Sequence, residues 1–178
     1  MTIAVKKESL FLGSFVKPFG IRGELKFVGS ENFWPGIFES NQLELLHEED
    51  GKVISVPVRF ESARPHGENF VVKLEHVIDR TGAELEVGGE LFIDPDQIDV
   101  DLPDEELPFQ VIGSVVKLEN GTTLGTITSV IFSAAHGVYE IEGDNGVVLI
   151  PAVDEFIVGR DYERGELTVR PIPGLVEP

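Results

Sequence analysis

The stretch Gly13–Phe27 (GSFVKPFGIRGELKF) holds the residues of this chain that are best suited to binding chemistry. Its three cations, Lys17, Arg22 and Lys26, lie among three glycines and one proline. Glycine lets a backbone turn tightly, and cations on such a turn can meet a phosphate, an RNA backbone or an acidic protein surface. Three functions therefore have to be compared: a phosphate cradle, an RNA-clamping turn and a protein-docking loop.

The spacing of the glycines decides against the first of these functions. A phosphate-binding loop needs G-x-x-x-x-G-K-[ST], but Gly20 and Gly23 are too close together and Gly13 and Gly23 are too far apart. Glu24 would also repel a phosphate at the point where a lysine should meet it. The segment Gly20–Gly23 has the letters of the GXXG clamp of KH domains, but that loop joins two helices, whereas strand patterns flank this one.

The stretch is best interpreted as a tight turn that presents side chains for recognition. Pro18 fixes its own φ and pushes the preceding residue into an extended conformation. The turn then lifts Lys17, Phe19 and Arg22 to the rim of a strand-rich domain, where recognition usually takes place. For Phe19 the alternative is that its ring packs inward.

Catalytic residues in a recognisable arrangement are sparse. The four histidines form no H-E-x-x-H motif and no i, i+4 pair, so the sequence predicts no metal site. No G-x-S-x-G nucleophile elbow is present, and a chain without cysteine has no thiol nucleophile. The 32 Asp and Glu residues are too many for a catalytic pair to be singled out. We therefore expect a binding protein that has no cofactor and is not an enzyme.

The charge of the chain argues against RNA as its main partner. Fourteen Lys and Arg residues face 32 Asp and Glu residues, which gives a net charge of −18. Binding to RNA depends on cations that neutralise phosphates, and residues 101–178 hold four cations against 14 acids. Such a field steers basic proteins toward the chain, although acidity can also serve solubility alone. Residues 1–30 are the exception, with five cations and two anions.

Length and apolar content indicate a globular protein of the cytoplasm. The 178 residues, 42% of them hydrophobic, allow one large domain or two small ones. No apolar run approaches the roughly 18 residues of a membrane span, and the run LFLGSF is too short for a secretory signal. The absence of cysteine agrees with a reducing compartment. We take a monomer as the default.

Period-two alternation dominates the first half of the chain and predicts strands. The predicted strands are LFLGSFVK, GELKFVGS, NQLELLHE, KVISVPVRF, ENFVVKLE and GELFID. Asp50-Gly51 predicts a hairpin turn, residues 32–38 a loop or helical turn, residues 63–69 a longer connection, and Arg80–Glu86 a short helix. Residues 1–93 are therefore expected to form a β-barrel of about six short strands.

The segment 94–108 (DPDQIDVDLPDEELP) has the composition of a linker. It carries three prolines and seven acids but no cation, so it is too charged to bury and is stiffened by proline. Residues 109–178 form a second strand-rich block with hairpin signals at Asn120-Gly121, Asn145-Gly146 and Arg164-Gly165. The sequence thus predicts an all-β protein of two small β-barrel domains, which an acidic linker joins.

Two sets of motifs resemble those of a known family. Residues 15–26 (FVKPFGIRGELK) resemble the N-terminal signature of the bacterial ribosome maturation factor RimM. In the second half, VIG at 111–113, NG at 120–121 with LG at 124–125, VLIPAV at 148–153 and PGL at 173–175 resemble the PRC-barrel domain of that family, in the same order.

The resemblance implies a function without catalysis. RimM-like proteins bind the immature 30S subunit and help its head assemble, so that precursor 16S rRNA can be processed. Their C-terminal barrel contacts the nineteenth small-subunit ribosomal protein. Because ribosomal proteins are basic, an acidic barrel suits this task, and direct RNA contact is expected to be minor at most. The alternatives are a module that binds RNA through the N-terminal rim and, more remotely, an enzyme of the flavin-reductase type.

One departure from the family concerns the start of the second domain. Family members usually carry paired aromatics there, and these matter for ribosome binding. In this chain Glu106-Leu107-Pro108-Phe109 occupies the region and the tyrosine pair is absent. An exposed apolar pair of Leu107 and Phe109 would suit a docking site, so both residues are predicted to bind the partner. The alternative is that Phe109 is the first core residue of the barrel.

Overall fold

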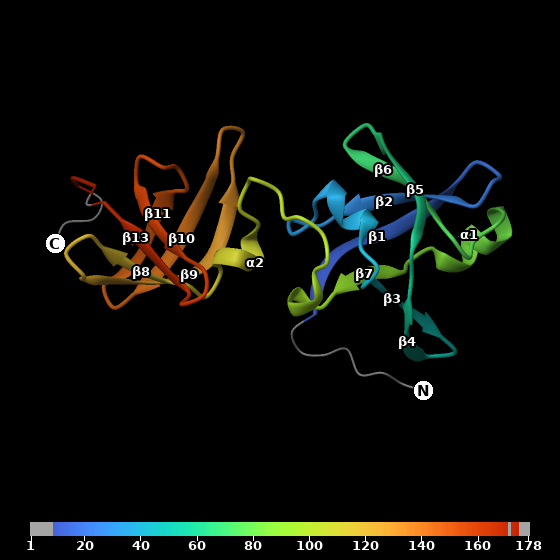
Figure 1. The fold of residues 1–178 in the computed structure, drawn as a ribbon, viewed down its shortest axis with the longest axis horizontal. Helices are drawn as coiled ribbons and strands as arrows, with labels where there is room; N and C mark the ends of the chain where they lie inside the picture. Colours follow the sequence, from blue (N-terminus) through green and yellow to red (C-terminus); the bar gives the residue numbers. More distant parts are fainter. Residues whose placement is uncertain (1–8, 171, 175–178) are drawn as a thin grey trace. The chain divides into compact units, whose positions relative to one another are not determined.

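The computed structural model describes residues 9–170 and 172–174 of the chain. The chain divides into two compact units, Met1–Glu105 and Glu106–Pro178, which are considered separately below (Figure 1). Both units consist mainly of strands, so the predicted all-β fold with two domains is confirmed. Among the described residues, none of the helices has the length and apolar character needed to cross a membrane.

Seven strands form one antiparallel sheet in the N-terminal unit, in the order β4-β3-β7-β1-β2-β6-β5. The strands are β1 (Leu10–Phe19), β2 (Glu24–Gly29), β3 (Glu44–Glu49), β4 (Lys52–Pro57), β5 (Phe60–His66), β6 (Asn69–Leu74) and β7 (Glu90–Ile93). The helical elements are the 3₁₀ helix η1 (Pro35–Glu39), the helix α1 (Arg80–Glu86) and the 3₁₀ helix η2 (Pro95–Gln97).

The helical elements follow local signals in the sequence. Pro35 occupies the first turn of η1, where its missing N–H would have no partner in any case. Asp79 caps α1, because its side chain accepts a hydrogen bond of 2.8 Å from the backbone N–H of Gly82. Both elements agree with the sequence prediction, which placed a helical turn at 32–38 and a helix at Arg80–Glu86.

Strand β5 corrects the sequence prediction. Residues 63–69 were expected to be a long connection, but residues 63–66 belong to β5, and a tight turn with Gly67 at a φ of 64° leads into β6. Pro65 and the polar residues around it interrupt the apolar–polar alternation that predicts a strand. An edge strand tolerates them because only one of its edges pairs within the sheet.

Phenylalanine rings fill the core of the N-terminal unit. Phe15 and Phe27 are fully buried, with ring centroids 5.5 Å apart. The ring centroid of Phe38 from η1 lies 5.3 Å from that of Phe27 and 4.8 Å from that of Phe60, so the short helix closes the core from one side. The remaining core consists mostly of Leu, Val and Ile from the strands.

Six strands form the sheet of the C-terminal unit, in the order β11-β10-β9-β8-β13-β12. They are β8 (Val115–Leu118), β9 (Thr123–Phe132), β10 (Gly137–Gly143), β11 (Gly146–Pro151), β12 (Ile157–Asp161) and β13 (Glu166–Val169). All neighbours are antiparallel except β13 and β8, which pair in parallel. The three hairpins predicted at Asn-Gly and Arg-Gly pairs join β8 to β9, β10 to β11 and β12 to β13.

A short helix, α2 (Pro108–Val111), begins the C-terminal unit, at the junction between the predicted linker and the predicted strand-rich block. Pro108 lies in its first turn, and the Gln110 side chain accepts a hydrogen bond of 2.8 Å from the backbone N–H of Leu107. Val111 packs into a core that otherwise comes from the strands. This core is Val111, Val116, Leu118, Ile127, Tyr139, Ile141, Ile150, Ile157, Leu167 and Val169.

The acidic segment between the predicted barrels makes specific contacts in the N-terminal unit. The Asp99 carboxylate accepts hydrogen bonds from Ser40 Oγ at 2.5 Å and from the backbone N–H of Asn41 at 3.1 Å. The indole N–H of Trp34 donates to the backbone carbonyl of Asp101 at 3.0 Å. Residues 94–101 therefore extend the N-terminal unit, whereas the sequence had assigned them to a linker.

Candidate partner-binding surfaces

The turn between β1 and β2 is tight and packs closely against its neighbours. Gly20 and Gly23 have φ values of +64° and +84°, a region that side chains disfavour. A Cβ atom on Gly23 would lie 2.9 Å from the carbonyl oxygen of Val77, so the turn packs tightly against the segment before α1. The Arg80 guanidinium donates a hydrogen bond of 3.0 Å to the carbonyl of Gly20. The prediction of a tight turn is confirmed.

The turn presents two cations and one apolar side chain to solvent. Lys17 and Arg22 are exposed, as expected, and neither has an ion-pair partner within residues 9–170 and 172–174. Ile21, between them on the turn, is 79% exposed. Phe19 is half-buried. Its exposure is therefore intermediate between the two predicted alternatives, a ring presented to solvent and a ring packed inward.

The sequence did not identify the neighbours of Phe19. The His66 ring meets it edge-on at 5.1 Å, and the Arg64 guanidinium carbon lies 5.6 Å from its ring centroid. Glu24 pairs with Arg64 and orients it over the ring. Arg64 and His66 come from β5, so recognising that strand would have revealed them. We call the set Lys17, Phe19, Ile21, Arg22 and Arg64 the turn surface.

The two predicted contact residues of the C-terminal unit lie at the start of α2. Leu107 is 8% exposed, so the expected exposed apolar pair is not formed. Phe109 is half-buried. Ile112, directly after α2, is the more accessible apolar side chain at 44% exposure. A partner-binding role for Leu107 and Phe109 stays a prediction.

Glu106 anchors this region through three distant residues. Its carboxylate accepts hydrogen bonds from the hydroxyls of Tyr139 and Tyr162, and Arg160 Nε donates to it at 2.9 Å. Burial raises the pKa of Tyr162 to about 12, and the hydrogen bond to Glu106 and its charge act in the same direction. The same causes raise the pKa of Tyr139 further, because Tyr139 is more deeply buried. Arg160 also binds Asp154 at 3.1 Å.

The outer side of strands β9, β10 and β11 combines acids with exposed apolar side chains. Glu140 pairs with Leu149, and Glu142 pairs with Val147, across β10 and β11. Because alternate residues of a strand share a face, these four side chains lie opposite the buried Tyr139 and Ile141. Ile131 of β9 is 46% exposed and belongs to the same face. We call Ile131, Glu140, Glu142, Val147 and Leu149 the acidic outer face.

Two histidines approach one buried carboxylate in the N-terminal unit. Glu86 of α1, 9% exposed, lies 2.9 Å from Nε2 of His76 and 3.4 Å from Nδ1 of His47. Within the part of the chain that the structure describes, no group of three or more acidic, histidine or cysteine side chains is placed to hold a metal ion. The contacts instead secure the C-terminal end of α1 to β3 and to the segment after β6.

These features define a two-domain all-β protein whose accessible surfaces suit macromolecular partners. The family model described as RimM N-terminal domain matches residues 10–98, and the one described as RimM PRC barrel domain matches residues 108–175. The chain therefore belongs to the RimM family of ribosome maturation factors.

Curated relatives are similar in sequence to this chain along most of its length. The ribosome maturation factor RimM of Prosthecochloris aestuarii is 33% identical over 159 residues, which cover 89% of this chain and 92% of that protein. The RimM of Parabacteroides distasonis is 32% identical over 176 residues, covering 97% and 99%. Among solved structures, a 16S ribosomal RNA processing protein RimM from Pseudomonas aeruginosa is similar with a TM-score of 0.44 and 23% identity, covering 91% of this chain and 96% of that one.

Proposed function

We propose that this chain is a non-enzymatic assembly factor that binds the immature 30S subunit in the cytoplasm and assists 16S rRNA processing. It binds, as a monomer, a basic ribosomal protein of the 30S head, which the family resemblance identifies as the nineteenth small-subunit protein. Direct contact with RNA is minor at most. The name of its relatives, ribosome maturation factor, supports this class of function.

The acidic outer face is the observation that carries the proposal. Glu140 and Glu142 lie there directly across from Leu149 and Val147, which are 45% and 60% exposed. A surface of this kind attracts a cationic protein at long range and gives it apolar contact area on arrival. It repels a phosphate backbone at the same time, which keeps free rRNA away from it.

This charge suggests how the factor acts. A basic ribosomal protein in an unfinished particle would otherwise bind any nearby phosphate backbone. An acidic surface competes for the same cations and releases them when correctly folded rRNA offers more phosphates. The chain would thus delay contacts of that protein until the head is ready.

The test compares two lysine substitutions in a pull-down of 30S precursors from cell extract. Leu149→Lys places a cation in the acidic outer face, and Val53→Lys is the matched control at a 50% exposed strand position of the N-terminal unit. We expect Leu149→Lys to weaken binding about tenfold or more, as for a residue central to an interface, and Val53→Lys to bind normally. Equal binding by both variants, or no association of the unaltered chain, would refute the proposal.

The turn surface supports a second candidate function, direct RNA binding by the N-terminal unit. Arg64 lies over Phe19, and Lys17 and Arg22 are exposed nearby in the sequence without ion-pair partners in the described chain. Such a combination can stack a base and neutralise phosphates. If this function holds, binding to a 16S fragment weakens with a log–log salt slope of about −0.7 for each phosphate contact, and Arg22→Gln lowers the slope. Absence of binding to naked RNA eliminates it.

A further inference from the structure

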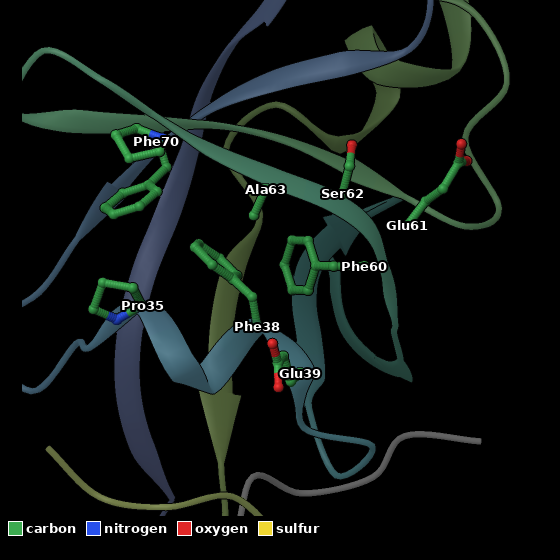
Figure 2. Close-up of a pocket in the computed structure, with 9 residues that line it drawn as sticks. Pro35, Phe38, Glu39, Phe60, Glu61, Ser62, Ala63 and Phe70 are labelled. Atoms are coloured by element: carbon green, nitrogen blue, oxygen red, sulfur yellow. The ribbon is translucent and has the colours of Figure 1, made fainter.

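A groove opens between the 3₁₀ helix η1 and strand β5 of the N-terminal unit. Its volume is about 410 Å³, within the range of pockets that hold a ligand or a side chain of a partner. Figure 2 shows Pro35 and Phe38 from η1 and Phe60 and Ala63 from β5, with the rings of Phe38 and Phe60 next to each other. The turn surface and the acidic outer face contribute none of its lining residues.

Aromatic rings form the floor of the groove. Phe38 is 7% exposed and contacts Phe60 at 4.8 Å and Phe70 at 5.5 Å, both edge-to-face. Phe60 and Phe70 are only half-buried, so part of each residue remains accessible. Three rings fixed by mutual contact offer a preformed surface for an aliphatic stem or for a cation.

The charged residues that line the groove are both acidic. Glu39 and Glu61 are its charged lining residues, and no cation lines it. Lys73 pairs with Glu61 at 3.1 Å, but Glu39 is exposed and has no ion-pair partner among the described residues. Figure 2 shows Glu39 beside the rings of Phe38 and Phe60. An occupant therefore gains from a positive charge placed near Glu39.

The position of β5 sets the form of the occupant. β5 is the last strand of its sheet, so one edge of it pairs with no other strand in the described chain. Ala63 and Pro65 line the groove from this edge, and both are exposed. An extended segment can lie along β5, although Pro65 offers no N–H and ends any strand-like pairing there.

We propose that this groove binds an extended, cationic protein segment and receives one arginine or lysine side chain. The aliphatic stem of that side chain lies on Phe38, Phe60 and Phe70, and its charged end meets Glu39. The site goes beyond the proposed function, because it gives the N-terminal unit a protein partner of its own. It does not depend on the acidic outer face, so either proposal can fail alone.

The test follows backbone amide signals of the full-length, isotope-labelled chain during titration with short peptides. The probe is the blocked heptapeptide GVRVRVG, and its matched controls carry citrulline or glutamate in place of both arginines. A proline-only peptide of the same length tests the alternative occupant of an aromatic groove. We expect saturable shifts in β5 and η1 with the arginine peptide, and binding about fivefold weaker with the citrulline peptide. Equal binding of the citrulline peptide, preferential binding of the proline peptide, or shifts confined to other strands would overturn the proposal.

Two variants test the assignment of the residues. Ala63→Arg, at an exposed edge position, fills the groove from its own rim and should abolish binding of the arginine peptide. Glu39→Gln should weaken it several-fold, while Glu48→Gln, an exposed acid on β3, serves as the matched control and should change nothing. If Glu39→Gln and Glu48→Gln bind the arginine peptide equally well, the charge assignment is wrong and the proposal fails.

Discussion

Replacing Glu106 by alanine should destabilise the C-terminal unit by about 2–3 kcal/mol. Tyr139, 1% exposed, would keep a buried hydroxyl without its acceptor, which costs about 1–3 kcal/mol. Loss of the partly exposed pair with Arg160 adds about 1 kcal/mol or less, because Asp154 still binds that guanidinium at 3.1 Å. For a domain of this size the midpoint of thermal unfolding should fall by roughly 10–20 °C.

The chain carries its own reporters for this measurement. Its two tyrosines, Tyr139 and Tyr162, both lie in the C-terminal unit, whereas its single tryptophan, Trp34, is buried in the N-terminal unit. Tyrosine absorbance during heating therefore follows one unit, and tryptophan emission follows the other. Glu106→Ala should move the tyrosine transition and leave the tryptophan transition in place.

Two further variants make the experiment decisive. Glu105→Ala removes the neighbouring carboxylate, which is exposed, and should change stability by less than about 0.5 kcal/mol. Tyr139→Phe removes the hydroxyl itself, so its combination with Glu106→Ala should cost less than the sum of the two single changes. If Glu106→Ala proves as stable as Glu105→Ala, or if the two effects simply add, the reasoning from the Glu106 contacts is refuted.

Three other predictions follow from the contacts described. Burial, and after it Glu106, raises the pKa of Tyr162 to about 12. The stability that its neutral phenol contributes is therefore complete below about pH 10 and is lost as the pH rises through 12. A spectrophotometric tyrosine titration should show this delayed ionisation. Gly23→Ala should lower the free energy of unfolding of the N-terminal unit, measured by Trp34 emission, by about 1–3 kcal/mol. Gly20→Ala should lower it less, because a Cβ at Gly20 meets no atom within 4 Å. Equal losses of stability would contradict the tight packing of Gly23. Hydrogen bonds from Ser40 and Asn41 lower the pKa of Asp99. The stability that the ionised Asp99 carboxylate contributes is therefore present above about pH 4 and is lost as the pH falls through the lowered pKa. Trp34 emission should detect this loss of stability in acid, and Asp99→Asn should not show it.

Local signals made most of the fold predictable from the sequence. Asp50 and Gly51 both adopt positive φ in the hairpin between β3 and β4, as their residue types indicate. The helix Arg80–Glu86 has the predicted bounds because Asp79 supplies a cap. Each of these features depends on residues within a few positions of one another.

Features that depend on distant partners could not be predicted. Nothing near Glu106 indicates that its partners are Tyr139, Arg160 and Tyr162, which lie 33 to 56 positions away. The parallel pairing of β13 with β8 has no local signature either. At the β1–β2 turn, the exposure of Lys17 was predictable from its type, but the contact of Arg64 with Phe19 required the pairing of β5 with β6.

The contacts of Asp99 and Asp101 affect where the chain can be divided for biochemical work. A fragment that stopped at residue 98, where the family match to the N-terminal domain ends, would deprive the Trp34 indole of its acceptor and Ser40 of the Asp99 carboxylate. Trp34 is 4% exposed, so its N–H would be left unsatisfied within the protein. A fragment that continues to Glu105 keeps both interactions, and comparing the two would show how much the acidic tail contributes to an N-terminal domain studied in isolation.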